Sequence, residues 1–357
     1  MKIKPTTKFA ILALSLVLVA CAGGGSEEAG CPAIDGREIN VVATTPMIGE
    51  FVSQVGGENI NLTVLMPPEA NPHTYEPAPQ DAGTIAEADL VFYTGLLYEP
   101  AALVKLLENS ACSTDILSEV GESVFPIEFK EGGHDDHDDH DDHDDEEGHD
   151  DHDDEEGHDD HDDEEGHDDE EGHDDHEGHN HGAYDPHFWF DPSRVAYAAE
   201  YIESRLIQFD PENESSYKSS ADSFVSELND LTKQVSELIS TVPSQNRKLI
   251  TTHESLGYLE AKFGLEVLST IIPSLNSANE ISPSDLAGVI DVIEDNNVKV
   301  IFIESEAPSV YSETIVAETG IKSVTGLYVE TLKPGQSYSE FLISNVKLIT
   351  ENLQDTD

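Results

Sequence analysis

One stretch of this chain cannot take part in a folded core. Residues 131–182 hold 30 Asp and Glu, 13 of the 16 His and no Lys or Arg, and the unit HDDHDDEEG recurs there. None of these residues is apolar. A segment with nothing to bury cannot offset the entropy lost on ordering. We therefore predict a disordered loop at 131–182 that interrupts an otherwise foldable chain.

The rest of the chain is acidic as well. The formal net charge is −58, and outside the tract 17 basic residues stand against 45 acidic ones, a net charge of −28. Nucleic-acid binding needs Lys and Arg to neutralise phosphates, so this composition argues against a nucleic-acid partner. About 280 residues remain without the tract and the first twenty residues, enough for two lobes with their own cores.

The first twenty residues have the pattern of an export signal. Three Lys precede an apolar run over 9–20, which is shorter than the roughly 20 apolar residues of a membrane span. Cys21 follows this run directly, as in lipoprotein processing. We predict a signal peptide (1–20), a lipid on Cys21 and a flexible tether (21–37); an ordinary signal peptide is the alternative. The protein would then be anchored outside the cytoplasm, in the periplasm or on the cell surface.

Two further cysteines remain if Cys21 carries a lipid. Cys31 and Cys112 would lie in an oxidising space, where a disulfide between them is expected. Two free buried thiols are the alternative. Neither cysteine has the CxxC spacing of a zinc or redox motif, so neither is a predicted metal ligand.

Short apolar runs alternate with helical patterns on both sides of the tract. We expect strands at 39–44, 61–66 and 89–93, and later at 248–252, 266–272, 299–303 and 322–329. Helices are expected between them at 255–263, 282–295, 309–318 and 337–353. Strands separated by helices are typical of parallel sheets, so the predicted fold class is α/β.

A long amphipathic helix separates the two alternating zones. Apolar residues recur over 219–240 at spacings of four and three, which gives one narrow apolar stripe. The predicted architecture is two similar lobes, each a mainly parallel sheet with flanking helices, joined by this helix. The first lobe takes 38–130 and 183–210, the linker helix 211–243 and the second lobe 244–357.

Three His residues lie outside the tract: His73, His187 and His253. Pro residues flank the first two, and His253 follows a predicted strand, where α/β sheets gather ligands. One such His taken alone is more often a structural residue. The three together indicate a metal site, because imidazole suits zinc and similar ions and three His with one carboxylate make a closed tetrahedral site.

The motifs around these His residues resemble those of a known family. PHTYEP around His73, PHFWFDP around His187 and THESLGY around His253 are similar to the His motifs of the zinc/manganese ABC-importer substrate-binding proteins. The resemblance extends from about residue 38 to the C-terminus and includes an acidic His-rich insert between the first two motifs. It implies two α/β lobes bridged by a helix, with the metal held between them.

The resemblance also implies a fourth ligand. The family usually has Asp in the context LYVETL, where this chain has Glu330, so we predict Glu330 as ligand; a water or another loop carboxylate is the alternative. Asp191 and Glu304 are weaker candidates, expected to orient ligand imidazoles. Three imidazoles and one carboxylate favour Zn²⁺ over Mn²⁺, which prefers more oxygen donors. The tract would collect dications weakly through its His and acidic side chains or sense their presence, and a solvating acidic loop is the alternative.

Together these features predict a monomeric zinc receptor that delivers its ion to the permease of an ABC importer and catalyses no reaction. An extracytoplasmic zinc buffer, or a metal-dependent surface adhesin without a transport partner, would use the same ligands. A zinc hydrolase would need an open coordination position and a general base, and four protein ligands argue against it.

Overall fold

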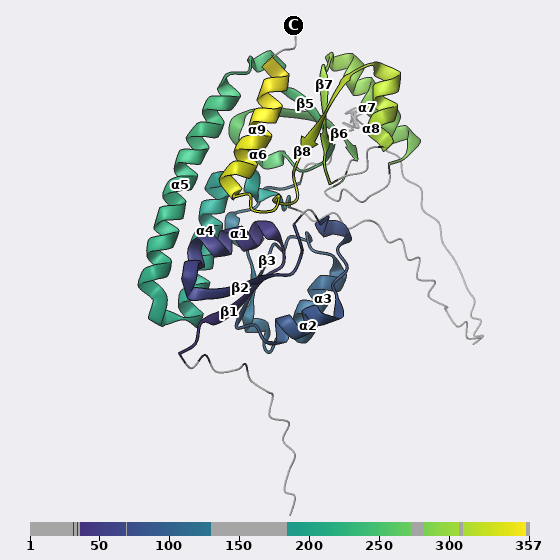
Figure 1. Ribbon diagram of the computed structural model, residues 1–357. Coiled ribbons are helices and arrows are strands. Elements are labelled where there is room, and N and C mark those ends of the chain that lie inside the picture. Colours follow the sequence, from purple (N-terminus) through teal and green to yellow (C-terminus); the bar gives the residue numbers. More distant parts are fainter. Residues whose placement is uncertain are drawn as a thin grey trace, which may run out of the picture.

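The computed structural model describes residues 31, 34, 36–68, 70–129, 184–272, 274, 281–306 and 310–354. The predicted signal peptide, Cys21, the predicted disordered loop and most of the predicted tether lie outside these residues. Figure 1 shows two α/β lobes, one above the other, with a long helix along one side. No helix of the described ranges is long and apolar enough to cross a membrane.

The first lobe is built on a four-stranded parallel sheet with the strand order β2-β1-β3-β4. Its strands are β1 (Ile39–Ala43), β2 (Ile60–Val64), β3 (Leu90–Tyr93) and β4 (Leu117–Glu119), and its helices are α1 (Pro46–Gly56), α2 (Pro79–Ala86) and α3 (Ala101–Ser110). Four of the five residues of β1 are buried, as expected for a parallel strand covered on both faces. Strand β4 was not predicted, because its three residues include Ser and Glu and carry no apolar run.

The second lobe repeats this arrangement with the strand order β6-β5-β7-β8, again all parallel. Its strands are β5 (Lys248–His253), β6 (Glu266–Ile272), β7 (Val300–Glu304) and β8 (Lys322–Leu327), and its helices are α6 (Gly257–Phe263), α7 (Pro283–Asn296), α8 (Val310–Thr319) and α9 (Tyr338–Gln354). Ser282 caps α7 in a capping box with Asp285, and Pro283 occupies the first position of this helix, which begins where the prediction for 282–295 placed it.

Two helices connect the lobes: α4 (Pro192–Phe209) and α5 (Glu214–Ser240). Helix α5 packs on α1 and α4 beside the first sheet and on α9 beside the second, and Figure 1 shows it running along both lobes. The predicted apolar stripe is the buried face of this helix, and Phe224, Leu228, Leu231 and Val235 all lie in the core. The predicted fold class, two parallel α/β lobes joined by a long helix, is confirmed.

One buried apolar cluster runs through both lobes, from Phe51 and Trp189 to Phe302 and Tyr338. Short 3-10 helices complete the described chain: η1 (Gly57–Asn59), η2 (Pro72–Thr74), η3 (Thr114–Ile116), η4 (Gly121–Val124), η5 (Phe188–Phe190), η6 (Pro211–Asn213) and η7 (Ser244–Asn246). Cys31 and Cys112 form a disulfide, which joins the chain ahead of β1 to the segment that follows α3.

Candidate metal centre

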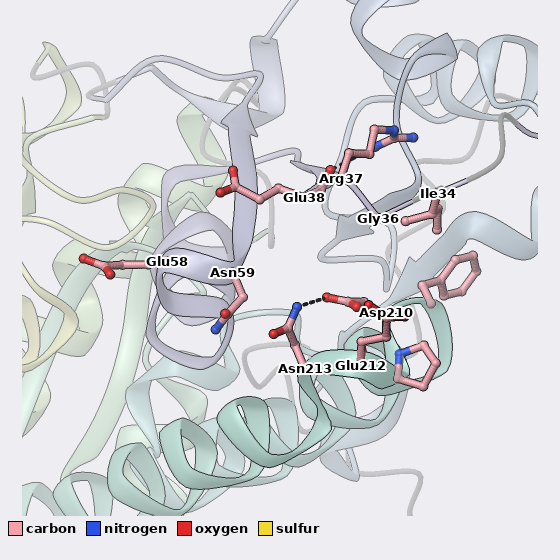
Figure 2. A pocket seen from close by; sticks show the side chains of 11 residues that line it. Ile34, Gly36, Arg37, Glu38, Glu58, Asn59, Asp210, Glu212 and Asn213 are labelled. Carbon is pink, nitrogen blue, oxygen red and sulfur yellow. Dashed lines mark hydrogen bonds between the residues drawn. The ribbon is translucent and has the colours of Figure 1, made fainter.

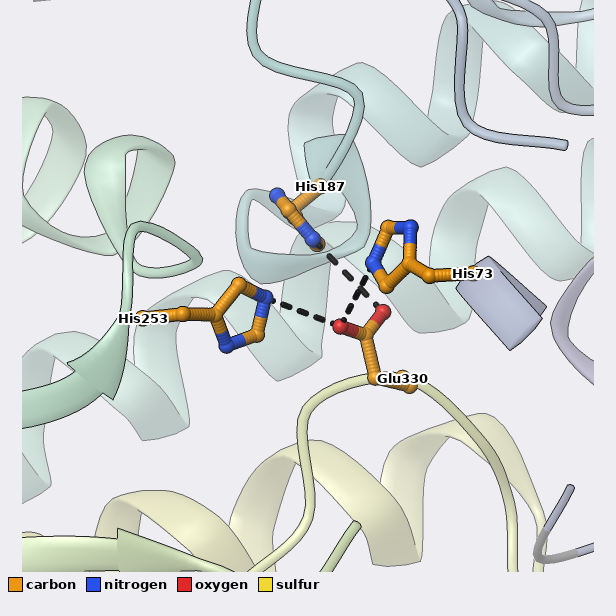
Figure 3. Close-up of side chains that lie close together, drawn as sticks. All are labelled: His73, His187, His253 and Glu330. Carbon is orange, nitrogen blue, oxygen red and sulfur yellow. Dashed lines mark hydrogen bonds and ion pairs between the residues drawn. The ribbon is translucent and has the colours of Figure 1, made fainter. Parts of the chain in front are cut away.

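Four side chains from both lobes meet where the carboxyl ends of the strands face each other. His73, His187, His253 and Glu330 each offer one ligand atom, and these atoms all lie within 4.8 Å of one another. Figure 3 shows the three imidazoles arranged around the carboxylate. These are the four residues that the sequence analysis proposed as ligands.

His73 and His187 come from the first lobe, and both are fixed by their own backbone. His73 lies in η2, and its backbone N–H donates to the side chain of Asn71, which caps this helix, at 2.9 Å. His187 directly precedes η5. Its backbone N–H and its ring Nδ1–H both donate to Oδ1 of Asp185, each at 2.8 Å. The Nδ1 contact with a carboxylate sets the tautomer and leaves Nε2 to face the centre.

His253 and Glu304 end neighbouring parallel strands of the second lobe. His253 is the last residue of β5 and Glu304 the last of β7. The Nδ1–H of His253 donates to Oε2 of Glu304 at 2.5 Å, and the backbone N–H donates to Oε1 at 3.1 Å. Glu304 is therefore placed to orient this imidazole, the role that the sequence analysis proposed for it.

The prediction for Asp191 was wrong. Its carboxylate caps α4, where it accepts hydrogen bonds from the backbone N–H and hydroxyl of Ser193 at 2.9 and 2.6 Å. Its charged neighbours are Arg194 and Lys262, both at 3.8 Å. Asp191 precedes a Pro at the first position of a helix, and this context favours an N-cap. The carboxylate that orients His187 is Asp185, two residues before it in a Pro-linked turn.

Glu330 lies on the loop after β8 and reaches all three imidazoles. Its Oε1 is 3.0 Å from Nε2 of His73 and 2.8 Å from Nε2 of His253. Its Oε2 is 3.6 Å from Nε2 of His187 and accepts a hydrogen bond from the hydroxyl of Tyr98 at 2.9 Å. The carboxyl of Glu306 supports this loop, because its Oε1 accepts the backbone N–H groups of Val329 and Glu330.

The donor atoms of the centre are buried and incompletely satisfied. The four side chains are between 0 and 4% exposed. Within the described ranges, the Nε2 atoms of His187 and His253 have no hydrogen-bond partner of good geometry, although both are buried. A buried nitrogen without a partner is costly. Two such atoms aimed at one carboxylate fit a cation that they would bind together.

The charges of the centre depend strongly on one another. Burial opposes protonation of His187, but the carboxylates of Glu330 and Asp185 outweigh it and raise the pKa to about 9. Burial likewise opposes the charge of Glu330, but His73, His253 and His187 hold the pKa of this carboxyl well below its usual range. Burial also raises the pKa of Glu306 to about 8, together with the charges of Glu330 and Glu304. The metal-free centre therefore pairs a carboxylate with protonated imidazole.

This pairing predicts competition between protons and metal. A ligand imidazole must be neutral, whereas His187 keeps its proton up to a pKa of about 9. Zinc affinity should therefore fall as the pH drops from 9 to 6, by about tenfold per pH unit for each proton released. Zinc titrations across this range, with proton release measured by calorimetry in buffers of different ionisation enthalpy, would check it. An affinity independent of pH would contradict it.

Two residues that support the centre, Asp185 and Tyr98, were not predicted. Asp185 could have been recognised from the sequence, because an Asp two residues before a His can accept a hydrogen bond from the backbone N–H of that His. Here its carboxylate accepts from both the backbone N–H and the ring of His187. Tyr98 carries no such signal. It lies in a loop of the first lobe, 232 residues from Glu330 along the chain, and only the packing of the two lobes brings them together.

A separate pocket of about 350 Å³ lies at the amino ends of β1 and β2 in the first sheet. Figure 2 shows it lined by residues that precede β1 and β2 and by the turn between α4 and α5. Asp210, one of its lining residues, already accepts hydrogen bonds from the side-chain amide of Asn213 and from the hydroxyl of Tyr217 behind the wall. Ligands of parallel sheets gather at the carboxyl ends of the strands, so this pocket does not compete with the His cluster.

Comparison with known proteins gives one family. The family model described as zinc-uptake complex component A, periplasmic, matches residues 41–352. The manganese ABC transporter substrate-binding lipoprotein PsaA of Streptococcus anginosus is 25% identical over 352 residues, covering 96% of this chain and 97% of the relative. The high-affinity zinc uptake system protein ZnuA of Bacillus subtilis is 27% identical over 355 residues, covering 97% and 96%.

Solved structures share the fold. The periplasmic zinc binding protein TroA from Treponema pallidum has a TM-score of 0.68 and 19% identity, and the alignment covers 88% of this chain and 99% of that one. The Fe(III)-bound YtgA from Chlamydia trachomatis also has a TM-score of 0.68, with 23% identity and coverage of 88% and 98%.

Proposed function

Because the chain belongs to the family of the periplasmic zinc-uptake complex component A, we propose that it is a receptor that binds zinc and delivers it to the permease of an ABC importer. The proposal rests on one observation: three imidazole nitrogens and one carboxylate are buried close together at the junction of the lobes. Two of these ligands come from each lobe. Release to a permease would therefore need the lobes to separate the ligand pairs.

The choice of zinc rests on the donor set. Relatives are named for manganese and for zinc, so family membership leaves the ion open. Three neutral nitrogens and one oxygen suit a tetrahedral zinc ion, whereas manganese favours more oxygen donors. Glu330, in place of the Asp that the resemblance implies, retains the same single carboxylate.

Transport is favoured over catalysis by the same geometry. A catalytic zinc keeps an open position for water, and structural or storage sites are closed by four protein ligands. Here the four side chains proposed as ligands converge and are almost fully buried. The ion is therefore cargo in this proposal, and the acidic tract would collect dications near the receptor.

The membrane anchor is the second part of the proposal. Several relatives are named as lipoproteins, and Cys21 follows the apolar run in the way that lipoprotein processing needs. We infer that Cys21 carries the lipid and that the protein works as an anchored monomer. A zinc buffer or adhesin would have the same centre, but its action would not depend on a permease.

Deleting residues 134–181 separates the centre from the tract. We expect the shortened protein to bind one zinc ion per chain with the tight affinity of the full-length protein, and manganese more weakly. Competitive titration with zinc and manganese, with metal content measured on the same sample, would check this. Loss of tight binding in the shortened protein would mean that the tight site lies in the tract. Tighter binding of manganese than of zinc would mean that manganese is the cargo.

A growth experiment distinguishes transport from buffering. Cells that lack this protein should grow poorly in zinc-depleted medium and recover when zinc is added. The intact protein should restore growth only in cells that keep their metal permease. Rescue without the permease would favour the buffer instead.

A further inference from the structure

Tyr98 lies against the metal centre but offers it no ligand. It belongs to the loop after β3 and is 2% exposed. The centroid of its ring is 5.2 Å from that of His73, 5.9 Å from that of His187 and 5.3 Å from that of Trp189. Its hydroxyl is the part that reaches across the lobes, to the carboxylate and the backbone carbonyl of Glu330 at 2.9 and 3.1 Å.

The two oxygens of Glu330 therefore have different surroundings. Oε1 faces His73 and His253 at 3.0 and 2.8 Å, in the middle of the donor atoms. Oε2 is the oxygen that accepts from Tyr98 at 2.9 Å, and it lies 3.6 Å from Nε2 of His187. One oxygen is directed to the centre, and the other is held by a hydrogen bond.

The loop that carries Tyr98 is held firmly and under backbone strain. Gly95, Leu96 and Leu97 all have positive φ, at 77°, 54° and 61°. Two consecutive Leu residues in this region are costly and persist only where the surroundings impose them. Here the backbone N–H of Leu96 donates to Glu119 at 2.9 Å.

Glu99 fixes the loop from the other side of Tyr98. Its buried carboxylate accepts from the hydroxyl of Thr44 and the backbone N–H of Thr94, both at 2.7 Å, and from the backbone N–H of Gly95 at 2.9 Å. Three hydrogen bonds to one buried group define the path of the backbone. The aim of the Tyr98 hydroxyl is therefore imposed by the fold.

We propose that Tyr98 determines metal specificity by holding Oε2 of Glu330 away from the ion, so that Glu330 binds through Oε1 alone. This inference rests on the proposed receptor function and adds the reason for its preference. With one carboxylate oxygen the centre provides four donors, the number that zinc takes. With both oxygens it would provide a fifth donor and a second oxygen, which suits manganese better.

Tyr98→Phe tests this, because it removes the hydroxyl and keeps the ring. We expect zinc affinity to fall roughly tenfold, as for the loss of a partner of a metal ligand. Manganese affinity should stay the same or rise, so the ratio of zinc to manganese affinity should fall at least about tenfold. A merely structural role would weaken both ions equally and leave the ratio unchanged.

Tyr338→Phe is the matched control. Tyr338 is also buried, and its hydroxyl donates across the lobes to the backbone carbonyl of Trp189 at 2.7 Å. It makes the same kind of interlobe hydrogen bond, but to a residue other than Glu330. The ratio of the two affinities should not change in this variant, and a change as large as that of Tyr98→Phe would overturn the proposal.

Cobalt(II) gives a readout that does not depend on affinity. Four-coordinate cobalt absorbs visible light far more strongly than five- or six-coordinate cobalt. The cobalt-loaded wild-type protein should therefore show the intense spectrum, and Tyr98→Phe a weaker one. A wild-type spectrum of five or six ligands would overturn the role of Tyr98 even if the variant did not fold. Absence of tight metal binding by the wild-type protein would instead contradict the receptor function itself.

Discussion

Replacing His253 with Ala should lower zinc affinity by more than about 100-fold. Loss of a residue that only supports a ligand typically costs 10- to 100-fold in metal affinity, and His253 is itself placed as a ligand. Its Nε2 is buried, lies 2.8 Å from Oε1 of Glu330 and has no hydrogen-bond partner of good geometry among the described residues. With Ala at this position, the buried centre would keep only three ligand donors for zinc. Competition with a chelator of known affinity would measure the loss.

Glu304→Gln provides the graded comparison for this variant. The carboxylate of Glu304 orients His253 through Nδ1 and the backbone N–H, and Gln keeps one oxygen that can accept from the ring. The expected loss is therefore smaller, at most about 10-fold. If His253→Ala bound zinc like the wild-type protein, His253 would not be a ligand. If Glu304→Gln were the more damaging change, Glu304 would have been assigned the wrong role.

The fold could be predicted well because its signals are local. Apolar runs flanked by turns predicted seven of the eight strands found in the described part of the chain, and Ser282 with the Pro after it stands at the start of α7. The missed strand, β4, has three residues and pairs only at the edge of the sheet. β4 is a strand because it pairs with β3, and the residues of β4 by themselves do not indicate this pairing.

The centre shows the same division between local and distant signals. His253 could be expected at the end of a strand, and Glu304 is at the end of the neighbouring strand. Asp191 was misassigned, because an acid before a Pro can cap a helix as well as orient a ligand. Tyr98 could not have been found, because its contact with Glu330 exists only when the two lobes pack together.

Glu330→Gln should remove tight zinc binding by an electrostatic route. The carboxylate is the only acidic member of the four-residue cluster, and a buried dication without a counter-charge is strongly disfavoured. We expect zinc affinity to fall by more than about 100-fold, as for His253→Ala.

The two variants should differ in the pKa of His187. Glu330 is the charge that does most to raise the pKa of His187 to about 9, so in Glu330→Gln this pKa should fall, with burial favouring the neutral ring. NMR titration of the His187 ring in the zinc-free proteins would show the shift.

Stability and a nearby control complete the test. Because the pKa of His187 is raised from 6.5 to about 9, its attraction to Glu330 stabilises the zinc-free fold fully below pH 6.5 and is lost as the pH rises through 9. The wild-type protein should therefore exceed Glu330→Gln in free energy of unfolding most near pH 6, and the difference should shrink toward pH 9. Asp191→Asn keeps an N-cap residue beside the centre and should change neither zinc affinity nor this pH dependence. If the pKa of His187 stayed near 9 in Glu330→Gln, Asp185 alone would hold the proton on this ring. Glu330 would then bind zinc as a ligand but would not take part in the competition between protons and zinc.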